Sequence, residues 1–463
     1  MVTPMTTPHP DFLSDPASIG PWLAMRRWYG DKSRTIVQSS PTRLGVVDLQ
    51  GAQAALFTVD LAFVDGAEAT YFVPIVQRAD GSEPSDALSE AAFLAWLASG
   101  FGEDRVLVLD DGSTLTWQRS KLESAAWWER SPQLLTGEQS NTSIRFGADA
   151  VVKIFRKWQP GVNPDTEIVQ YLTEHSGFTH VPAYLGGIRL ERAGTLVEVA
   201  AGQTFVVNDG DCWTWLPPAL AELSEAALPA LLDSVGLLGQ RTGELHAALA
   251  YGTGEQFAPE EVTALDAAAV RQRIAHEVAV SITMLVEAGM LAPEEGSTLE
   301  RDLLARMGDA TALVGTARTR VHGDYHLGQV LRSNDDFVII DFEGEPSRPM
   351  RERREKHSPL KDVAGMLRSL DYAVATAVQA AGENRAPFLG DVGSRMEEAF
   401  LDGYAAGIAD GPDWILPSEA ETFRMALNLY MIEKALYETR YELDNRPDWI
   451  SIPFGALQRI AAS

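Results

Sequence analysis

Cysteine, basic residues and long apolar runs are scarce in this chain, and each scarcity excludes a class of protein. Cys212 is the single cysteine, so no intramolecular disulfide can form, and no Cys/His pattern has the spacing of a zinc site. Lysine and arginine number 38 against 65 acidic residues, and the net charge of -27 disfavours nucleic acid and anionic membranes as partners. No apolar run approaches the roughly 20 residues that a membrane helix needs.

The remaining composition is that of an ordinary soluble protein. Hydrophobic residues make up 45% and charged residues 22% of the chain, and 463 residues are enough for two or three domains with separate cores. Residues 1–12 lack the basic and apolar blocks of a signal peptide. We therefore expect a cytoplasmic protein, and nothing in the sequence implies an obligate protein partner.

The most informative stretch is residues 321–345, which read VHGDYHLGQVLRSNDDFVIIDFEGE. Asp324 is followed five residues later by Gln329, and Asp341 ends an apolar, strand-like run. Protein kinases use H-R-D-x-x-x-x-N and then D-F-G for phosphoryl transfer: one carboxylate accepts a hydroxyl proton, while an amide oxygen and a second carboxylate hold Mg²⁺. The spacing predicts Asp324 as the base and Gln329 and Asp341 as magnesium ligands. A hairpin with solvated acids would leave this match unexplained.

Residues 134–207 follow the β-β-α-β-β order of a kinase N-lobe. Lys153 lies in the middle of an expected strand, and a lysine on a buried strand is costly unless it is paired. Kinases tie this lysine to a helix glutamate, so Glu167 is the predicted partner. The alternative is an edge strand from which Lys153 reaches solvent. We expect strands at 141–146, 150–155, 183–189, 195–200 and 203–207, and a helix at 164–175.

Two segments of this unit are expected to contact ATP. The polar loop 136–143 precedes the lysine strand and can cover phosphates with backbone N–H groups and hydroxyls, which points to Ser140 and Asn141. Residues 203–207 form a candidate hinge between lobes, whose backbone would meet adenine. The expected contacts there are Gln203, Val206 and Val207.

The rest of the chain divides into a β-rich start and a helical end. Residues 1–133 contain alternating runs typical of antiparallel strands, a helix at 89–97 and a hairpin around Asp110-Asp111-Gly112. From residue 208 onward helical periodicity dominates, interrupted at 321–341 by the catalytic loop. The sequence therefore predicts an α+β protein with units at 1–133, 134–207 and 208–463.

Taken together, these residues show that the chain resembles the actinobacterial maltokinase-like sugar kinases, which have the aminoglycoside phosphotransferase fold. The resemblance covers nearly the whole chain; matching segments are 27–34, 137–143, 161–165, 322–329, 341–346 and 358–369. It implies a bilobal, protein-kinase-like enzyme that uses ATP and Mg²⁺, with an N-terminal cap subdomain over 1–133. It also implies an acidic sugar pocket in the helical lobe and a supporting role for Glu343 at the metal or the loop.

Two acceptors are known in this family: maltose, at its anomeric hydroxyl, and glucosamine, at its 6-hydroxyl. Glu438 and Glu442 stand one helical turn apart and repel each other unless a cation lies near. Lys434 or Arg446 could supply that cation, and so could a substrate ammonium. The acid excess favours glucosamine, but carboxylates also bind neutral hydroxyls, so maltose stays open. Expected acceptor contacts are Asp324 and Glu438, followed by Tyr437, Arg440, Glu442 and Trp449.

Two other classes fit the sequence less well. A nucleotide-binding regulatory pseudokinase would not need the intact set of Lys153, Asp324, Gln329 and Asp341. A protein kinase would need an activation segment ending in A-P-E after Asp341, and none is present.

Overall fold

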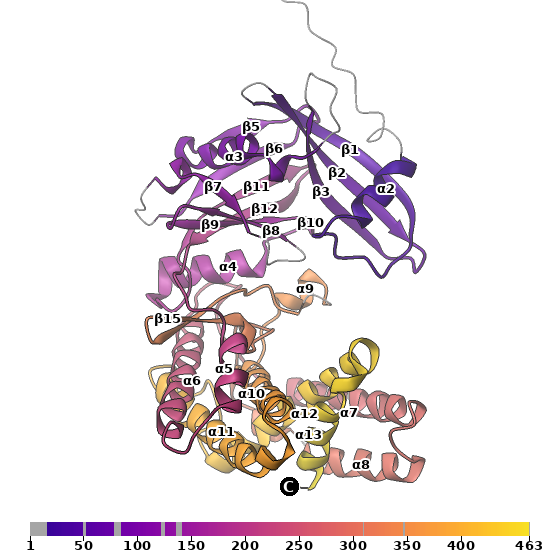
Figure 1. Cartoon of the computed structure of the whole chain (residues 1–463), viewed down its shortest axis with the longest axis vertical. Helices are drawn as coiled ribbons and strands as arrows, with labels where there is room; N and C mark the ends of the chain where they lie inside the picture. Colours follow the sequence, from indigo (N-terminus) through magenta and orange to yellow (C-terminus); the bar gives the residue numbers. More distant parts are fainter. Residues whose placement is uncertain are drawn as a thin grey trace, which may run out of the picture. The chain divides into compact units, whose positions relative to one another are not determined.

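The computed structural model describes residues 16–49, 52–77, 85–121, 126–135, 141–308, 310–345 and 348–462. Contacts between residues divide the chain into two compact units (Figure 1). Unit 1 holds residues 1–170 and 182–207, and unit 2 holds residues 171–181 and 208–463. The predicted α+β class is confirmed, since antiparallel sheets build unit 1 and helices build most of unit 2.

The first sheet of unit 1 is antiparallel and built mainly from the start of the chain. Its strands are β1 (Ile36–Leu49), β2 (Ala52–Phe63), β3 (Glu68–Gln77) and β10 (Lys157–Trp158), in that order, and β4 (Ser85–Asp86) pairs with β3. Helix α2 (Pro16–Ala24) packs Ile19 and Leu23 into a core with Phe57 and Tyr71. Because side chains alternate between the two faces of a strand, the opposite face of this sheet is left for a second core.

That second core lies between the first sheet, helix α3 (Ala91–Glu103) and a seven-stranded sheet. Phe72 from β3, Phe101 from α3 and Val152 from the second sheet are all buried in it. The seven strands run in the order β5 (Val106–Val108), β6 (Thr114–Arg119), β11 (Tyr184–Arg192), β12 (Thr195–Thr204), β9 (Ala150–Phe155), β8 (Asn141–Phe146) and β7 (Pro132–Leu134). All neighbouring strands in this sheet are antiparallel.

Two sequence expectations for unit 1 differ from the structure in detail. The predicted boundary at 133/134 falls within β7, and strands on both sides of it share the seven-stranded sheet. The two strands expected at 195–200 and 203–207 are one strand, β12, whose pairing with β9 continues through Gly202 and Gln203 to Thr204. No break occurs there because the backbone ladder to β9 stays in register. The division of unit 1 into cap and N-lobe remains a prediction.

Unit 2 consists mainly of helices. They are α5 (Cys212–Ala221), α6 (Leu228–Ala250), α7 (Ala264–Glu287), α8 (Pro293–Arg306), α9 (Met350–Arg353), α10 (Leu360–Ala381), α11 (Ala386–Ile408), α12 (Ala420–Asn445) and α13 (Ser451–Ala462). Helices α6 and α11 approach closely: a Cβ atom at Gly239 would overlap the Phe400 carbonyl oxygen, and one at Gly403 would overlap the Gly236 carbonyl oxygen. The small residues therefore set the distance between these two helices.

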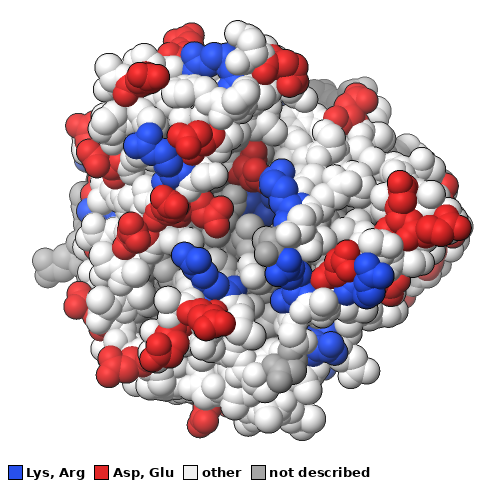
Figure 2. All heavy atoms as spheres, turned by 90° about the horizontal axis from the view of Figure 1, so that it is seen from below, with Lys and Arg blue, Asp and Glu red and all other residues white. Residues whose placement is uncertain are grey.

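Short strands interrupt the helices of unit 2. β15 (Val330–Ser333) and β16 (Asp336–Ile339) form the hairpin that follows the catalytic loop, and β13 (Glu260–Glu261) pairs with β14 (Ala317–Arg318). Helix α4 (Pro164–Tyr171) is followed by a π-helical turn over Leu172–Ser176. Within the described part of the chain, every helix is too short or too polar to span a bilayer. Acidic and basic side chains are interspersed on the face shown in Figure 2.

Candidate active site

The loop that carries Asp324 is anchored by a buried carboxylate, Asp362, which the sequence analysis did not single out. Asp362, at the start of α10, is 1% exposed and accepts hydrogen bonds from the backbone N–H groups of His322 (2.7 Å) and Gly323 (2.9 Å). His246 Nε2 lies 3.2 Å from the same carboxylate. Burial would raise the pKa of Asp362, but these hydrogen bonds and the nearby imidazoles hold it below its ordinary value. Asp362 therefore anchors the loop as an anion.

His322 supports the loop from inside. Its Nε2 lies 2.9 Å from the Ile340 carbonyl oxygen, and its Nδ1 accepts a long hydrogen bond of 3.4 Å from the Asp324 backbone N–H. Gly323 between them has φ +86°, a left-handed conformation that glycine adopts without steric cost. The imidazole thus connects Asp324 to the strand that leads to Asp341.

Asp324 faces a lysine from α12. Lys434 Nζ lies 3.6 Å from Asp324 Oδ1 and 3.5 Å from Glu345 Oε1. Burial by itself would lower the pKa of Lys434, but Asp324, Glu345 and Glu438 raise it above its ordinary value, so the ammonium stays charged. Sequence reasoning considered Lys434 only as a counter-ion for the glutamates one turn away on α12.

The two predicted magnesium ligands lie together. Gln329 Nε2 donates a 3.1 Å hydrogen bond to Asp341 Oδ2, and the Ile340 backbone N–H donates to the Gln329 carbonyl oxygen at 2.9 Å. Asp341 has φ 66°, which an aspartate adopts at a cost of about 1 kcal/mol. Residues held in such strained conformations cluster at functional sites. Glu343 follows two residues later, and its backbone carbonyl accepts from Arg353.

In unit 1, Lys153 has a carboxylate partner that the sequence analysis did not name. Its Nζ lies 3.5 Å from Asp165 Oδ2, and Gln203 Nε2 donates to the same oxygen at 3.3 Å. Asp165 is 1% exposed and sits in the first turn of α4, where the Asn163 side chain accepts its backbone N–H. Glu167 is also buried on α4, and its pairing with Lys153 stays a prediction.

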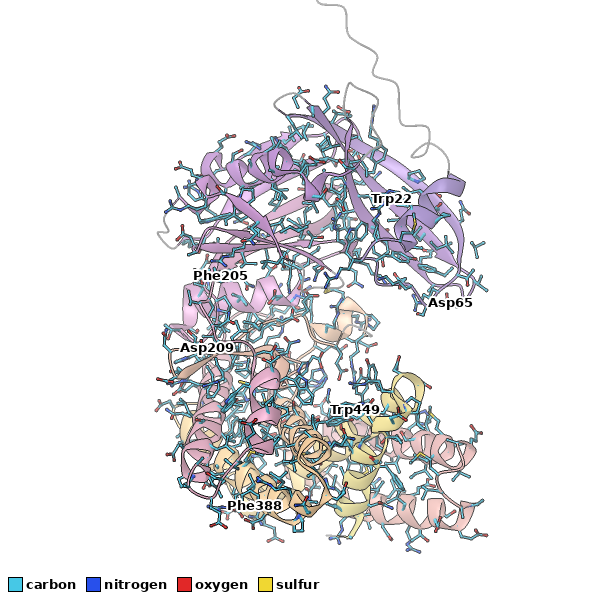
Figure 3. All side chains as sticks on the ribbon, in the orientation of Figure 1. Trp22, Asp65, Phe205, Asp209, Phe388 and Trp449 are labelled. Carbon is cyan, nitrogen blue, oxygen red and sulfur yellow. The ribbon has the colours of Figure 1, made fainter. Side chains whose placement is uncertain are left out.

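The other predicted nucleotide contacts lie at the ends of strands. Asn141 is the first residue of β8, opposite Phe155 at the end of β9; Ser140 lies outside the described residues. Val206 and Val207 follow β12, and the chain passes from unit 1 to unit 2 after Val207, whose side chain is exposed. The Arg145 guanidinium carbon lies 4.0 Å from the ring centroid of Phe205, which is labelled in Figure 3.

The predicted acceptor residues on α12 have partners within unit 2. Glu438 accepts from Arg368 Nε at 2.8 Å, and Glu442 accepts from Tyr372 and Arg446 at 3.0 Å and 2.7 Å. Arg446 therefore neutralises Glu442, as one of the two sequence alternatives proposed. Burial raises the pKa of Glu438, although Arg368 and Lys434 oppose that rise.

The remaining acceptor candidates point in different directions. Arg440 turns toward α7, where it donates to Ser281 at 2.8 Å. The Tyr437 ring lies 4.9 Å from Lys434 Nζ, which places it next to the catalytic loop. Trp449, labelled in Figure 3, stacks on Tyr372 with ring centroids 6.2 Å apart.

A small depression next to Asp324 is lined by charged groups of both signs. Its acids are Glu277, Glu345, Asp362 and Glu433, and its cations are Arg348, Lys361 and Lys434. Glu433 Oε1 lies 2.5 Å from Arg273 Nη1. Burial would raise the pKa of the Glu433 carboxyl, but this guanidinium group keeps it below its usual value. Such paired groups are preorganised to hydrogen-bond a polyhydroxylated or charged ligand. None of these residues except Lys434 was considered at the acceptor end by the sequence analysis.

Comparisons with known proteins show which families the chain is similar to. The chain matches the phosphotransferase enzyme family over residues 132–349 and the maltokinase N-terminal cap domain over residues 22–111. It is 28% identical over 402 residues to a glucosamine kinase of Mycolicibacterium smegmatis, covering 83% of this chain and 92% of that protein. A glucosamine kinase of Streptacidiphilus jiangxiensis is 27% identical over 446 residues, covering 92% of each chain.

Among solved structures, the fold is similar to that of a glucosamine kinase in complex with glucosamine, ADP and inorganic phosphate. The TM-score is 0.70 at 22% identity, and the match covers 98% of this chain and 100% of the other. A second crystal structure of a glucosamine kinase gives a TM-score of 0.68 at 21% identity, covering 91% of each chain. The fold therefore extends over both units.

Proposed function

Because this chain belongs to the maltokinase-like sugar kinases of the phosphotransferase enzyme family, we propose that it transfers the γ-phosphoryl group of ATP to the 6-hydroxyl of glucosamine. The observation that carries the proposal is the cluster of Asp324, Gln329 and Asp341. The Asp324 backbone N–H donates to His322, whose other ring nitrogen contacts the carbonyl of Ile340, and the next residue, Asp341, accepts from the Gln329 amide. That is the set of groups that phosphoryl transfer to a hydroxyl requires.

Asp324 is the proposed general base. It orients the acceptor hydroxyl and takes its proton as the oxygen attacks phosphorus. Lys434, 3.6 Å away, holds the carboxylate in place and keeps it from repelling Glu345. Proton transfer by a positioned base contributes roughly 10² to 10⁴ in rate.

The residues around Asp341 fit a magnesium ion. Carboxylate and amide oxygens are the ligands that Mg²⁺ prefers, and Gln329 and Asp341 are adjacent. Gln329 and Asp341 would hold the ion, with Glu343 in support. When bound, Mg²⁺ neutralises charge on the phosphates of ATP.

In unit 1, Lys153 is proposed to bind the ATP phosphates. Asp165, at 3.5 Å, and Glu167 on the same helix would keep its ammonium charged and oriented. Asn141 and Ser140 are proposed at the phosphates, and Gln203, Val206 and Val207 at the adenine.

For the acceptor, we propose contacts from Asp324, Glu438 and Tyr437, with Trp449 as an apolar plate for the sugar face. Both curated relatives are glucosamine kinases, which supports an amino sugar. Glu438 and the acids near Lys434 could receive its ammonium. Arg440 and Glu442, which are held by α7 and α10, would act by supporting α12.

Maltose remains the second candidate because of one specific observation. Glu438 and Glu442 already have the cationic partners Arg368 and Arg446. The proposed acceptor site therefore has less need of a substrate ammonium. The arrangement of carboxylates and guanidinium groups would also suit neutral hydroxyls. The stacked pair of Trp449 and Tyr372 would suit a second sugar ring.

A coupled assay of ADP release on four acceptors tests the proposal. Glucosamine, glucose, maltose and N-acetylglucosamine are compared at equal concentration, with ATP and Mg²⁺. We expect the highest kcat/KM on glucosamine and a marked loss on N-acetylglucosamine, whose amide carries no charge. Activity on maltose alone would replace glucosamine with maltose as the acceptor.

A further inference from the structure

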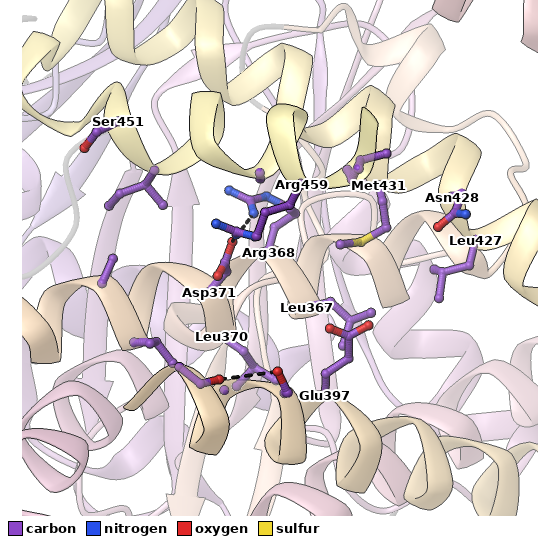
Figure 4. A pocket seen from close by; sticks show the side chains of 18 residues that line it. Leu367, Arg368, Leu370, Asp371, Glu397, Leu427, Asn428, Met431, Ser451 and Arg459 are labelled. Carbon is purple, nitrogen blue, oxygen red and sulfur yellow. Dashed lines mark hydrogen bonds and ion pairs between the residues drawn. The ribbon is translucent and has the colours of Figure 1, made fainter. Parts of the chain in front are cut away.

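Unit 2 contains a second cavity that the proposed reaction does not use. It has a volume of about 600 Å³, within the range of small-molecule sites, and lies among α10, α11, α12 and α13 (Figure 4). Leu367, Leu427 and Met431 supply apolar wall, and Arg368, Asp371 and Arg459 supply charge. Lys434, Glu438 and Asp324 do not line it.

One buried donor at this cavity lacks an acceptor. Arg368 is 1% exposed; its Nε donates to Glu438 and its Nη1 donates to Asp371 at 2.5 Å. Its Nη2 has no hydrogen-bond partner among the described residues. A buried guanidinium nitrogen without an acceptor is unfavourable, so this atom is open to an oxygen from a water or a ligand.

A second guanidinium group converges on the same place. Arg459 of α13 pairs with the Asp371 oxygen that Arg368 also contacts, so two guanidinium groups share one carboxylate (Figure 4). Guanidinium groups bind phosphate through paired, charge-assisted hydrogen bonds. Glu397 also lines the cavity, and its labelled carboxyl lies away from this pair in Figure 4. A carboxyl there suits the hydroxyl or amino groups of a sugar-sized body.

We propose that this cavity binds the phosphate monoester of a small, sugar-sized molecule, with the phosphate at Arg368 and Arg459. Such a ligand would also act on the acceptor end of the reaction. Arg368 donates to Glu438. Lys434, one helical turn before Glu438 on α12, lies 3.6 Å from Asp324 Oδ1. An added acceptor on Arg368 would change how firmly Glu438 is held, and hence the KM for the sugar. This kinetic consequence rests on the proposed function, but the binding itself does not.

The cavity offers a substitution that fills it without disturbing the fold. Gly390 lines the cavity, and a Cβ atom there would meet no other atom within 4 Å. Gly390 is in the first half of α11, where replacing glycine favours the helix. Gly390→Leu should therefore block the site while keeping or raising the Tm, and Gly390→Ala is the matched control.

Isothermal titration calorimetry of the full chain with glucosamine 6-phosphate, glucose 6-phosphate and inorganic phosphate tests binding. We expect saturable binding of at least one phosphate monoester to the wild type and to Gly390→Ala, and binding roughly tenfold or more weaker in Gly390→Leu and Arg459→Gln. Equal binding of inorganic phosphate and the esters would support the site with free phosphate as its ligand. No binding, or the same Kd in Gly390→Leu, would overturn the proposal.

Kinetics then test the coupling separately. The ester that binds should change the KM for the acceptor sugar more in the wild type than in Gly390→Leu, because competition by a product-like ester at the acceptor site is common to both proteins. If the ester binds at the cavity but the KM does not move, the connection through Arg368 and Glu438 is wrong. If the wild type has no activity on any sugar while the ester still binds, the proposed function fails and the cavity site stands.

Discussion

Lys434 Nζ lies 3.6 Å from Asp324 Oδ1, so the proposed base of the reaction is paired with a lysine from the helix that carries the proposed sugar contacts. The same ammonium lies 3.5 Å from Glu345. One side chain thus joins the catalytic loop, the segment after Asp341 and α12. This pairing ties the placement of the base to the helix that would read the acceptor.

Replacing Asp324 with asparagine should remove turnover but keep ATP binding. The amide cannot accept the hydroxyl proton, and we expect kcat to fall by about 10³ or more. Measurement of kcat by ADP release and of ATP affinity by titration checks both halves. Turnover at the wild-type rate in Asp324→Asn would show that another group is the base.

Lys434→Met should lower kcat/KM for the sugar by roughly 10- to 100-fold, because Asp324 and Glu345 would then repel each other across a site that has lost its cation. Lys434→Arg is the matched control, since it keeps the charge, and it should retain more activity than Lys434→Met. Equal loss in the two variants would mean that packing, and not charge, is what Lys434 supplies.

The half-buried imidazole of His357 should make unit 2 less stable in mild acid. Burial, with Lys361, Arg273 and Arg348 nearby, lowers the pKa of His357 to about 3. Between the unfolded value near 6.5 and this folded value, the unfolded state binds more protons, so stability falls as pH falls. The slope is about 1.4 kcal/mol per pH unit for this one group.

Urea unfolding at several pH values measures this slope. His357→Gln, which cannot titrate, should lose less stability than the wild type between pH 6.5 and pH 5, by about 2 kcal/mol. Parallel curves for the two proteins over that range would contradict the assignment to His357.

The buried ion pair between Asp86 and Arg156 should stabilise the strands of unit 1. Arg156, just after β9, is 1% exposed and donates to Asp86 at 2.6 Å and to Thr142 at 2.8 Å. Asp86→Ala would leave this guanidinium buried without its carboxylate, at a cost of roughly 3–5 kcal/mol. Thermal unfolding checks this, with Asp104→Asn as the control, because asparagine also tolerates the left-handed backbone of this position.

Asp104 is a suitable control because it also pairs with an arginine of unit 1, but at the surface. Breaking an exposed pair costs little. A similar drop in Tm for Asp86→Ala and Asp104→Asn would contradict the special importance of the buried pair.

The proposed catalytic set of Asp324, Gln329 and Asp341 could be predicted because its members are close in sequence. Asp324 and Gln329 share one loop, and a short hairpin returns the chain to Asp341, so spacing alone brings them together. The α+β class followed in the same way from the local periodicity of strands and helices. These features depend on neighbours within about 20 residues of one another.

Features that depend on distant neighbours could not be predicted. The pair of Lys153 and Asp165 is an exception, since it spans only 12 positions: Asn163 caps α4 and thereby sets which residues of its first turn face β9. Glu438 contacts Arg368 on α10, 70 positions away, and spacing on α12 gives no sign of that partner. Asp362 lies in segment 358–369, which resembles the sugar kinase family. Only the folded loop reveals that Asp362 anchors His322 and Gly323.

The most direct test of the central claim is the identity of the product. Purified full-length protein is incubated with ATP, Mg²⁺ and an equimolar mixture of glucosamine and maltose, and the products are followed by ³¹P NMR. The account predicts a single new phosphomonoester whose phosphorus couples to the C6 protons of glucosamine, and no new signal with Asp324→Asn. Maltose 1-phosphate as the only product, or an unchanged yield from Asp324→Asn, would contradict it.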